Sequence, residues 1–284
     1  MSTAIPAMRG PALAVLAAAA IVATPAARAA DYTSTDYLVP GEESFILDLG
    51  GIVNQFDTSL RLDGQTTRGS DVNLERNGEA KNLSSFEAFA TWRFLSRHRL
   101  DLQYFGTKRS GSQDYTGAID IGDATFPVGA NVSVQAKSQF FNADYRYSFA
   151  KAPDWEFAGL VGFYGGKFTY DVNATGQSGN LQATYNKTVS TTVPLPLLGV
   201  TLDWYPDRQW KVSGQLQGMK ANIGDVDGHA YLAGASLEYM LWRNLGIGTR
   251  YLYSDVNVDV SKSDFHGNLS WKMNSWSLYA KLAF

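Results

Sequence analysis

The end of the chain alternates between apolar and polar side chains up to the final residue. The apolar face takes every second position and consists of Trp276, Leu278, Ala280, Leu282 and Phe284. The positions between them are mostly polar and include Lys281. A period of two is typical of a β-strand with one apolar face. A strand that ends a chain leaves a free edge, which is covered when the last strand of a sheet pairs with the first. The terminus therefore predicts a closed β-barrel.

The N-terminus has the three parts of a secretory signal peptide. Arg9 lies near the start, an apolar run follows from Pro11 to Ala23, and Ala27-Arg28-Ala29 fits the small-residue cleavage pattern. The alternative is a weak hydrophobic N-terminal helix. The order of the three parts predicts a signal peptide over residues 1–29, a short periplasmic segment over residues 30–42 and an outer-membrane barrel over residues 43–284.

The composition excludes several kinds of site and partner. Cysteine is absent, so the chain can form neither disulfides nor thiolate metal sites. A formal net charge of -3 argues against a nucleic-acid partner. After the predicted signal peptide, no apolar stretch approaches the ~20 residues that a membrane-spanning helix needs. We therefore expect an all-β fold, no cofactor, no metal site and no nucleic-acid partner.

About ten alternating segments, each long enough for a tilted transmembrane strand, fill the rest of the chain. They cover residues 45–62, 84–95, 99–110, 132–149, 155–172, a segment ending at 204, 210–217, 231–239, 245–253 and the strand that ends at 284. Phe140 beside Phe141 interrupts the alternation and predicts a bulge. Pro194 and Pro196 cannot donate to a ladder, which predicts that they lie at the outer margin of their strand.

Connections between these segments alternate between short and long. The longer ones are predicted over residues 63–81, 111–131, 173–186, 222–228 and 260–266. Outer-membrane barrels have short periplasmic turns and longer outer loops, so this rhythm predicts an up-and-down antiparallel barrel with both termini in the periplasm. Aromatic residues near the short turns are expected to form the inner girdle: Trp92, Phe94, Tyr147, Phe149, Trp155, Trp204, Tyr205, Trp210 and Trp242.

Several loose motifs, spread over nearly the whole mature chain, support the same class. They are Arg97-His-Arg-Leu100, Tyr104-Phe105, Gly122-Asp123, Phe126, Tyr145-Arg-Tyr-Ser-Phe149, Pro194-Leu-Pro196 and the C-terminal strand. With these motifs the chain resembles an uncharacterised proteobacterial family of Gram-negative outer-membrane β-barrels. The resemblance implies an outer-membrane location, contact with outer-membrane lipid, and assembly by periplasmic chaperones and the barrel-assembly machinery, with Phe284 as the assembly signal. It implies no chemistry. A soluble β-sandwich or a periplasmic lipocalin-like barrel is the alternative, because alternation alone does not distinguish them.

Both signs of charge lie at positions that the alternation places inside the barrel. The luminal charges are Asp48, Glu87, Arg93, Asp101, Asp144, Arg146, Lys211, Glu238, Arg250 and Lys281, together with Asp203. Charges in a narrow lumen must pair or be hydrated. Ten strands enclose little more space than the side chains fill, which favours a paired polar core over a small-solute conduit. Glu238 and Arg250 are expected to meet diagonally or through a third group.

The histidines near the outer rim are the only candidates for catalysis. His229 lies in Asp225-Val-Asp227-Gly-His229, and His266 lies in Asp264-Phe-His266. This Asp-x-His pattern is similar to the rim motif of the omptin proteases, which use aspartates and a histidine to activate water. The rest of the omptin pattern is not recognisable. We therefore predict a porin-like, non-enzymatic outer-membrane barrel with a structural, adhesive or minor small-solute transport role. An outer-rim hydrolase is the alternative, and the specific ligand is not predicted.

Overall fold

The computed structural model describes residues 37–65, 67–73, 75, 82–115, 118–121, 124–126, 130–178, 181–261 and 266–284. The predicted signal peptide lies outside these residues, as does Asp264 of the predicted rim cluster. The division of the N-terminus into a signal peptide and a periplasmic segment therefore stays a prediction. Among the described residues, no helix is long and apolar enough to cross a membrane.

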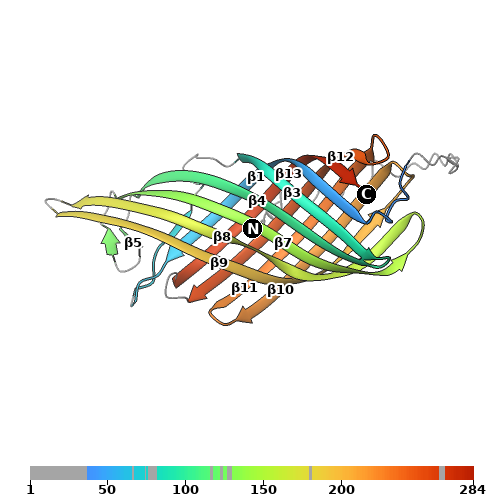
Figure 1. Cartoon of the computed structure of the whole chain (residues 1–284). Coiled ribbons are helices and arrows are strands. Elements are labelled where there is room, and N and C mark those ends of the chain that lie inside the picture. Colours follow the sequence, from blue (N-terminus) through green and yellow to red (C-terminus); the bar gives the residue numbers. More distant parts are fainter. Residues whose placement is uncertain are drawn as a thin grey trace, which may run out of the picture. The chain divides into compact units, whose positions relative to one another are not determined.

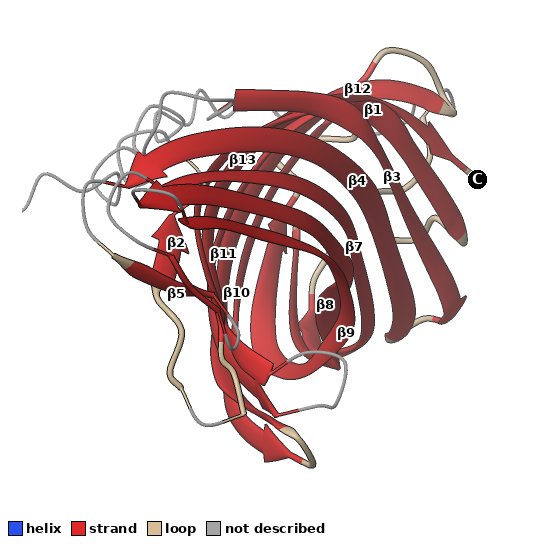
Figure 2. Ribbon diagram, turned by 90° about the vertical axis from the view of Figure 1, so that its left-hand side faces the viewer, coloured by secondary structure: helices blue, strands red, loops and turns tan. Residues whose placement is uncertain are grey.

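In the described part of the chain, ten long antiparallel strands form a closed ring (Figures 1 and 2). The ring consists of β1 (Phe45–Leu62), β3 (Asn82–Leu95), β4 (His98–Tyr115), β7 (Ala130–Lys151), β8 (Trp155–Ser178), β9 (Leu181–Trp204), β10 (Trp210–Ile223), β11 (Val226–Met240), β12 (Leu245–Ser261) and β13 (His266–Ala283). Each strand pairs with the next one of the ring along the chain, and β13 pairs with β1 from Ile46–Ala283 to Leu62–Gly267. The predicted barrel, its strand number and its closure by the last strand are confirmed.

Three short strands lie in the loops at the other end from the short turns. β2 (Asp71–Asn73) pairs with the end of β1, and β5 (Ile119–Ile121) pairs with β6 (Ala124–Phe126). We call this end the outer end and the end with the short turns the periplasmic end. Ile119 is buried in the apolar core at the outer end, so the β5–β6 hairpin helps to cover the barrel interior.

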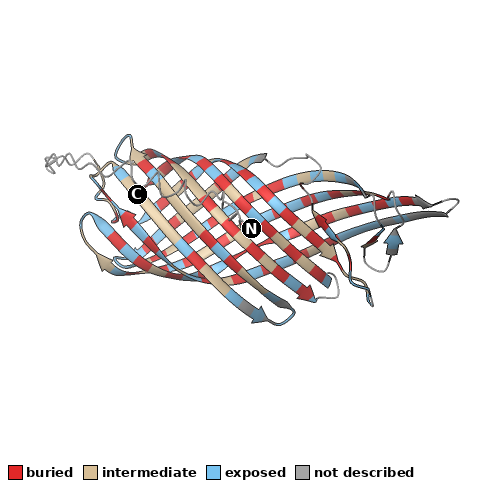
Figure 3. Ribbon diagram, turned by 180° about the vertical axis from the view of Figure 1, so that it is seen from behind, coloured by how far each residue is buried: buried red, intermediate tan, exposed pale blue. Residues whose placement is uncertain are grey.

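Buried and exposed residues alternate along the strands, as the checkerboard in Figure 3 shows. In the periplasmic half, the exposed face is apolar and aromatic, with Phe86, Leu102, Phe163 and Leu278 among its side chains. The buried positions between them carry charged and amide groups. A barrel with an apolar outer face and a polar interior is suited to a membrane, because its lipid-facing side chains lie in hydrocarbon.

This polarity reverses in the outer half of the barrel. On β1 the exposed face changes from Val53 to the polar residues Gln55 and Asp57, while the buried face changes from Asp48 to Phe56. The outer half therefore resembles a soluble barrel with an apolar core, built on top of a membrane barrel with a polar core. The predicted paired polar core is correct for the periplasmic half only. The reversal is visible in the sequence: along one strand, the apolar residues move from the outward-facing positions to the alternate, inward-facing positions.

The same reversal explains why the bulge predicted at Phe140 is wrong. Phe140 and Phe141 are both in regular register with β4 and β8, with Phe140 buried and Phe141 facing outward. Two adjacent aromatic residues occur here because the inward positions change from polar to apolar at this level. The register irregularities of the described sheet lie near the periplasmic end, at Arg93/Leu95 and at Ser148/Ala150.

Strands also run further outward than predicted. Most of residues 173–186, predicted as a loop, continue β8 and β9, and the β10–β11 connection is a tight turn at Gly224 and Asp225. Gly224 has a φ of 59°, a conformation that glycine adopts without strain. These extensions are not recognisable as membrane strands in the sequence. Their outward side chains are polar, because only the membrane part has an apolar outer face.

The prediction that Tyr205 belongs to the inner aromatic girdle is wrong. Its side chain is buried, beside Gly41 of the segment that precedes β1. That segment lies across the periplasmic mouth: Lys151 donates a hydrogen bond to the Gly41 carbonyl (2.9 Å), and Gln209 donates one to the Tyr37 hydroxyl (3.0 Å). The periplasmic end of the barrel is thus partly covered by the chain itself.

We predict that a charge at Leu102 disturbs the barrel more than a charge at its neighbour Gln103. Leu102 faces lipid near the middle of the apolar band, where an arginine costs about 2–4 kcal/mol. Gln103 points into the lumen and donates to Glu87, which also pairs with Arg250. The second carboxylate oxygen of Glu87 has no hydrogen-bond partner among the described residues, so an arginine at position 103 can bind it. Folding yield of Leu102→Arg and Gln103→Arg in lipid vesicles tests this. A lower yield for Gln103→Arg would mean that the register is shifted by one residue.

Candidate functional site

The luminal charges lie together in the periplasmic half of the barrel, and most of them form ion pairs. Arg250 contacts both Asp48 (2.8 Å) and Glu87 (2.9 Å), and Lys281 contacts Glu238 (2.5 Å). Glu238 and Arg250 have separate ion-pair partners but meet through a third group, as predicted. The Tyr279 hydroxyl donates to Glu238 (3.0 Å), and the Arg250 guanidinium lies 4.6 Å from the centre of the Tyr279 ring. Two residues of this network, Arg99 and Glu156, were missed by the sequence analysis, although their strand parity places them inside.

A second chain of contacts extends across the lumen. Arg93 binds Glu156 (2.9 Å), and Arg99 lies between Glu156 (3.5 Å) and Asp203 (3.1 Å). Lys211 is 3.9 Å from both Asp203 and Glu238, which joins this chain to the pair with Lys281. Arg146 pairs with Asp101. Several of these contacts join strands that are not neighbours, such as β3 with β8 and β4 with β9, so the network links separate parts of the wall.

Asp144 is the exception to this pairing. Six luminal carboxylates pair with six cations: Asp48, Glu87, Asp101, Glu156, Asp203 and Glu238 with Arg93, Arg99, Arg146, Lys211, Arg250 and Lys281. Within the described residues, Asp144 has amide partners in place of a cation, since Asn142 (2.9 Å) and Gln217 (3.1 Å) donate to one of its oxygens. It borders a polar cavity of about 60 Å³, which holds only a small number of water molecules.

We predict that Asp144 and Asp203 respond differently to neutralisation. Asp203→Asn removes one of the two buried carboxylates that pair with Arg99 and one of the two that pair with Lys211. The network is then left with an uncompensated positive charge, which costs up to about 3–5 kcal/mol. Asp144→Asn removes a charge that forms no ion pair among the described residues and should change stability little or raise it. Urea unfolding of the barrels in detergent, followed by tryptophan fluorescence, measures both. Equal losses in the two variants would contradict this account of the charges.

An aromatic layer lies directly outward of the charge network. Phe140 stacks on Phe105 at a ring distance of 4.7 Å and meets Phe168 edge-on at 5.5 Å. Trp271 packs against Phe168 at 4.9 Å, and Phe56 lies 6.1 Å from Phe140. These side chains come from β1, β4, β7, β8 and β13, and each is at most 3% exposed. The layer therefore packs apolar side chains across the interior between these five strands.

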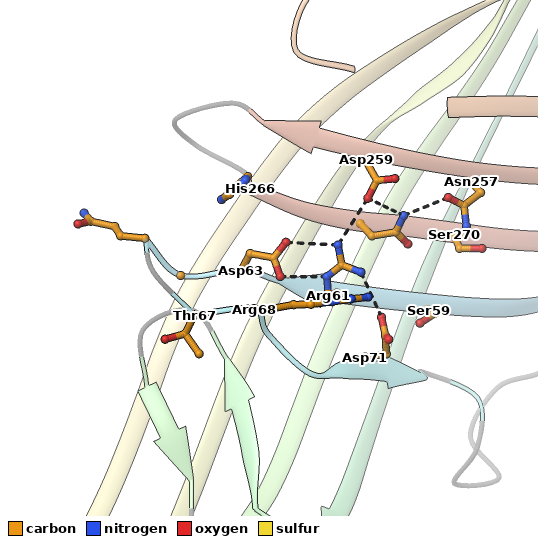
Figure 4. A pocket seen from close by; sticks show the side chains of 13 residues that line it. Ser59, Arg61, Asp63, Thr67, Arg68, Asp71, Asn257, Asp259, His266 and Ser270 are labelled. Atoms are coloured by element: carbon orange, nitrogen blue, oxygen red, sulfur yellow. Dashed lines mark hydrogen bonds and ion pairs between the residues drawn. The ribbon is translucent and has the colours of Figure 1, made fainter. Parts of the chain in front are cut away.

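A pocket of about 870 Å³ lies on the outer wall of the barrel, near the outer ends of β1, β12 and β13 (Figure 4). Its residues point away from the lumen, since the positions between them belong to the buried core. The lining is polar and includes Ser59, Arg61, Asp63, Arg68, Asn257, Asp259, His266, Asn268 and Ser270. We call it the outer-wall pocket. The sequence does not predict this pocket, because its alternation implies apolar outward positions throughout.

Arg61 is held at the centre of the outer-wall pocket by three carboxylates. Its Nε donates to Asp63 (2.9 Å), and its Nη atoms lie 3.5 Å from Asp259 and 4.0 Å from Asp71. Burial acts to raise the pKa of Asp63, but hydrogen bonds from Arg61 and from the Gly69 N–H outweigh it, and the pKa lies below its usual range. Both groups are therefore charged at neutral pH, and their charges are largely satisfied within the pocket.

Amide groups form the other side of the outer-wall pocket. The Asn268 side chain donates to the side-chain oxygens of Asn257 (3.0 Å) and Asp259 (3.1 Å). Hydroxyl groups of Ser59 and Ser270 and the ring of His266 complete this part of the lining. Such a surface offers hydrogen-bond donors and acceptors with little unpaired charge.

The predicted rim cluster is divided between two places. Asp227 and His229 lie on the outer wall of β11, whereas His266 lines the outer-wall pocket beside Asp63. His229 pairs with Asn257, which in turn pairs with Ser270, so the two histidines are two strands and four residues apart, or roughly 16 Å. Asp225 forms the β10–β11 turn. In the described residues, no three His, Asp and Glu side chains are arranged to hold a metal ion.

Phe284 lies where the barrel closes. Its N–H donates to the Phe45 carbonyl (2.8 Å), and its own carbonyl accepts from Ser44 (2.7 Å) and Phe45 (3.0 Å). The ring is exposed at the lipid face. Its role as an assembly signal stays a proposal.

Comparison with solved structures defines the class of the protein. The outer-membrane protease OmpT of Escherichia coli superposes with a TM-score of 0.58 and 9% identity, covering 89% of this chain and 99% of OmpT. A Pseudomonas aeruginosa FadL homologue gives a TM-score of 0.34 at 12% identity (85% and 90% covered), and Ail of Yersinia pestis gives 0.27 at 14% (84% and 98% covered). No protein-family model and no curated protein matches the sequence.

The protein therefore has the fold of a Gram-negative outer-membrane β-barrel. The likeness to OmpT shows this fold, and together with the lipid-facing band it supports the predicted outer-membrane location. At 9% identity, this similarity shows the fold alone.

Proposed function

We propose that the protein is a non-conducting outer-membrane barrel that binds a hydroxyl-rich ligand, such as a surface saccharide, in its outer-wall pocket. Of the predicted structural, adhesive and transport roles, this proposal selects the adhesive one and assigns no catalysis. The main support for this proposal is the aromatic layer. A lumen closed by this layer does not pass solutes, so the function is expected at the outer surface.

Two features of the interior support a closed barrel. The aromatic layer of Phe56, Phe105, Phe140, Phe168 and Trp271 is packed ring against ring, and a dry apolar layer opposes the passage of ions and polar solutes. Below it, the paired charges fill the lumen apart from the small polar cavity. Solute transport is therefore the less favoured role.

The chemistry of the outer-wall pocket supports a neutral polar ligand. Arg61 is occupied by three carboxylates, which disfavours an anion as the main ligand. Apart from Arg68, the groups that remain are amides, hydroxyls and an imidazole, which form hydrogen bonds to hydroxyl groups in either direction. The pocket is open and wide enough for a group larger than a single ion.

We expect purified protein to produce no stable conductance steps in planar lipid bilayers. An open pore needs a continuous water-filled path, and the aromatic layer interrupts it. The control is a known porin reconstituted in the same lipid and detergent. A large, ion-selective conductance from the wild-type protein would contradict the closed barrel and would mean that the luminal charges line a pore.

We expect saccharide binding that depends on the amide side of the outer-wall pocket. Asn257→Ala combined with Asn268→Ala should weaken binding to the best ligand of a glycan array by at least about tenfold, which is the value of one or two lost hydrogen bonds. Asn274→Ala, further along β13 towards the membrane, is the matched control and should bind as the wild type does. A wild-type protein that retains no saccharide, or equal binding by both variants, would refute the proposal.

A further inference from the structure

The wall of the barrel is open between β9 and β10 in the outer half. β9 pairs with β8 along its whole length of 24 residues, but with β10 only over Leu198–Trp204. β10 continues to Ile223 and is paired there with β11 alone. Figure 1 shows β8 and β9 running on beyond the β10–β11 hairpin. Among the described residues, the last pair of this seam is Leu198–Gly218.

The open seam is built into the sequence of β9. Pro194 and Pro196 lie on β9 just outward of the last pair. Both stay in register with β8. Because they are two residues apart, their backbone N and C=O groups face the same edge of β9, the edge towards β10. Because proline has no N–H to donate, it is confined to strand edges that need no partner. The seam therefore starts at a fixed level, directly above Leu198.

An apolar groove lies on the lipid side at the base of this seam. It has a volume of about 440 Å³ and is lined by Leu198, Leu216, Gly218, Tyr231, Ala233 and Tyr253. Leu198, Leu216 and Tyr231 are all more than half exposed, so the groove is continuous with the lipid-facing band. Gly218 keeps the groove open, since a Cβ there would come to 2.9 Å from the Tyr231 ring.

Two basic side chains lie immediately outward of the groove. Lys220 and His229 are paired across β10 and β11 and both face outward, one outward-facing step beyond the pair of Gly218 with Tyr231. Lys220 is exposed, and the His229 ring lies 5.5 Å from Tyr231. The order along the wall is thus an apolar groove, a tyrosine at the interface and then two nitrogen donors. This order matches a lipid that has an acyl chain below an anionic head group.

We propose that this groove binds one acyl chain of a phosphorylated outer-leaflet lipid, the lipid A part of lipopolysaccharide, with its phosphate held by Lys220 and His229. Lys220 supplies the charge, and the imidazole of His229 supplies a second hydrogen-bond donor. The lipid site shares no residue with the outer-wall pocket. This proposal is therefore independent of the proposed function, and the two are tested separately.

Native mass spectrometry of the refolded full-length barrel with lipid A tests the proposal. We expect the wild type to retain one lipid A, and Gly218→Leu and Ala233→Leu each to weaken retention by at least tenfold because leucine fills the groove. Gly51→Leu is the matched control, since Gly51 also faces lipid, on β1, with nothing within 4 Å of its Cβ position. Faster gel migration without boiling verifies that each variant is folded. Two groove variants are used so that the test remains possible if one of them does not fold.

The head-group assignment is tested with Lys220→Gln and with lipid A from which both phosphates have been removed. We expect Lys220→Gln to weaken retention of lipid A by about tenfold and to leave retention of the dephosphorylated lipid unchanged. Equal retention by Gly218→Leu, Ala233→Leu and Gly51→Leu, or no lipid kept by the wild type, would overturn the assignment of the groove as the acyl-chain site. Equal retention of phosphorylated and dephosphorylated lipid by the wild type would overturn the role of Lys220 and His229.

Discussion

Backbone pairing around the full ring is the constraint on which the rest of this structure depends. In the hydrocarbon of a membrane, an unpaired N–H or C=O group costs several kcal/mol, so a strand can cross only with partners on both sides. The ladder between β13 and β1 provides this closure, from Ile46–Ala283 to Leu62–Gly267. The carbonyl and N–H of Phe284 continue it to the end of the chain. Closure fixes the register, and the register decides which side chains face the lumen, where the ion pairs form.

The reversal of polarity along the strands divides the interior into two parts with different stabilisation. Near the periplasm the walls are held by ion pairs such as Arg99 with Asp203, which must form because neither charge has access to bulk water. Beyond the membrane the outer face meets water, so the interior gains from apolar burial, as at Phe140 and Trp271. The same change puts polar residues such as Arg61 on the outer wall. The apolar interior and the outer-wall pocket thus have one physical cause.

The sequence predicts the parts of the fold that depend on a regular period. The ten strands, the closure and the inward direction of charges such as Glu238 follow from alternation, because membrane strands separate the two faces sharply. The alternation is misleading where it changes its phase: it predicts a bulge at Phe140 and a loop over residues 173–186, and the structure has regular strands at both places. The pocket around Arg61 was missed for the same reason. Pairing within the lumen, such as that of Arg250 with Asp48 and Glu87, joins strands far apart in sequence and needs the closed ring.

The level at which β9 and β10 separate follows from the same rule that closes the barrel. The two strands are paired over Leu198–Trp204, where the exposed side chains of β9 are apolar and water cannot reach the backbone. Pro196 and Pro194 come directly above, where the outward side chains become polar and water can bind the free carbonyl groups. Pairing is therefore kept through the hydrocarbon and given up only beyond it. An open edge at that height leaves a groove bordered by lipid below and by Lys220 and His229 above, which is the position of a lipid head group.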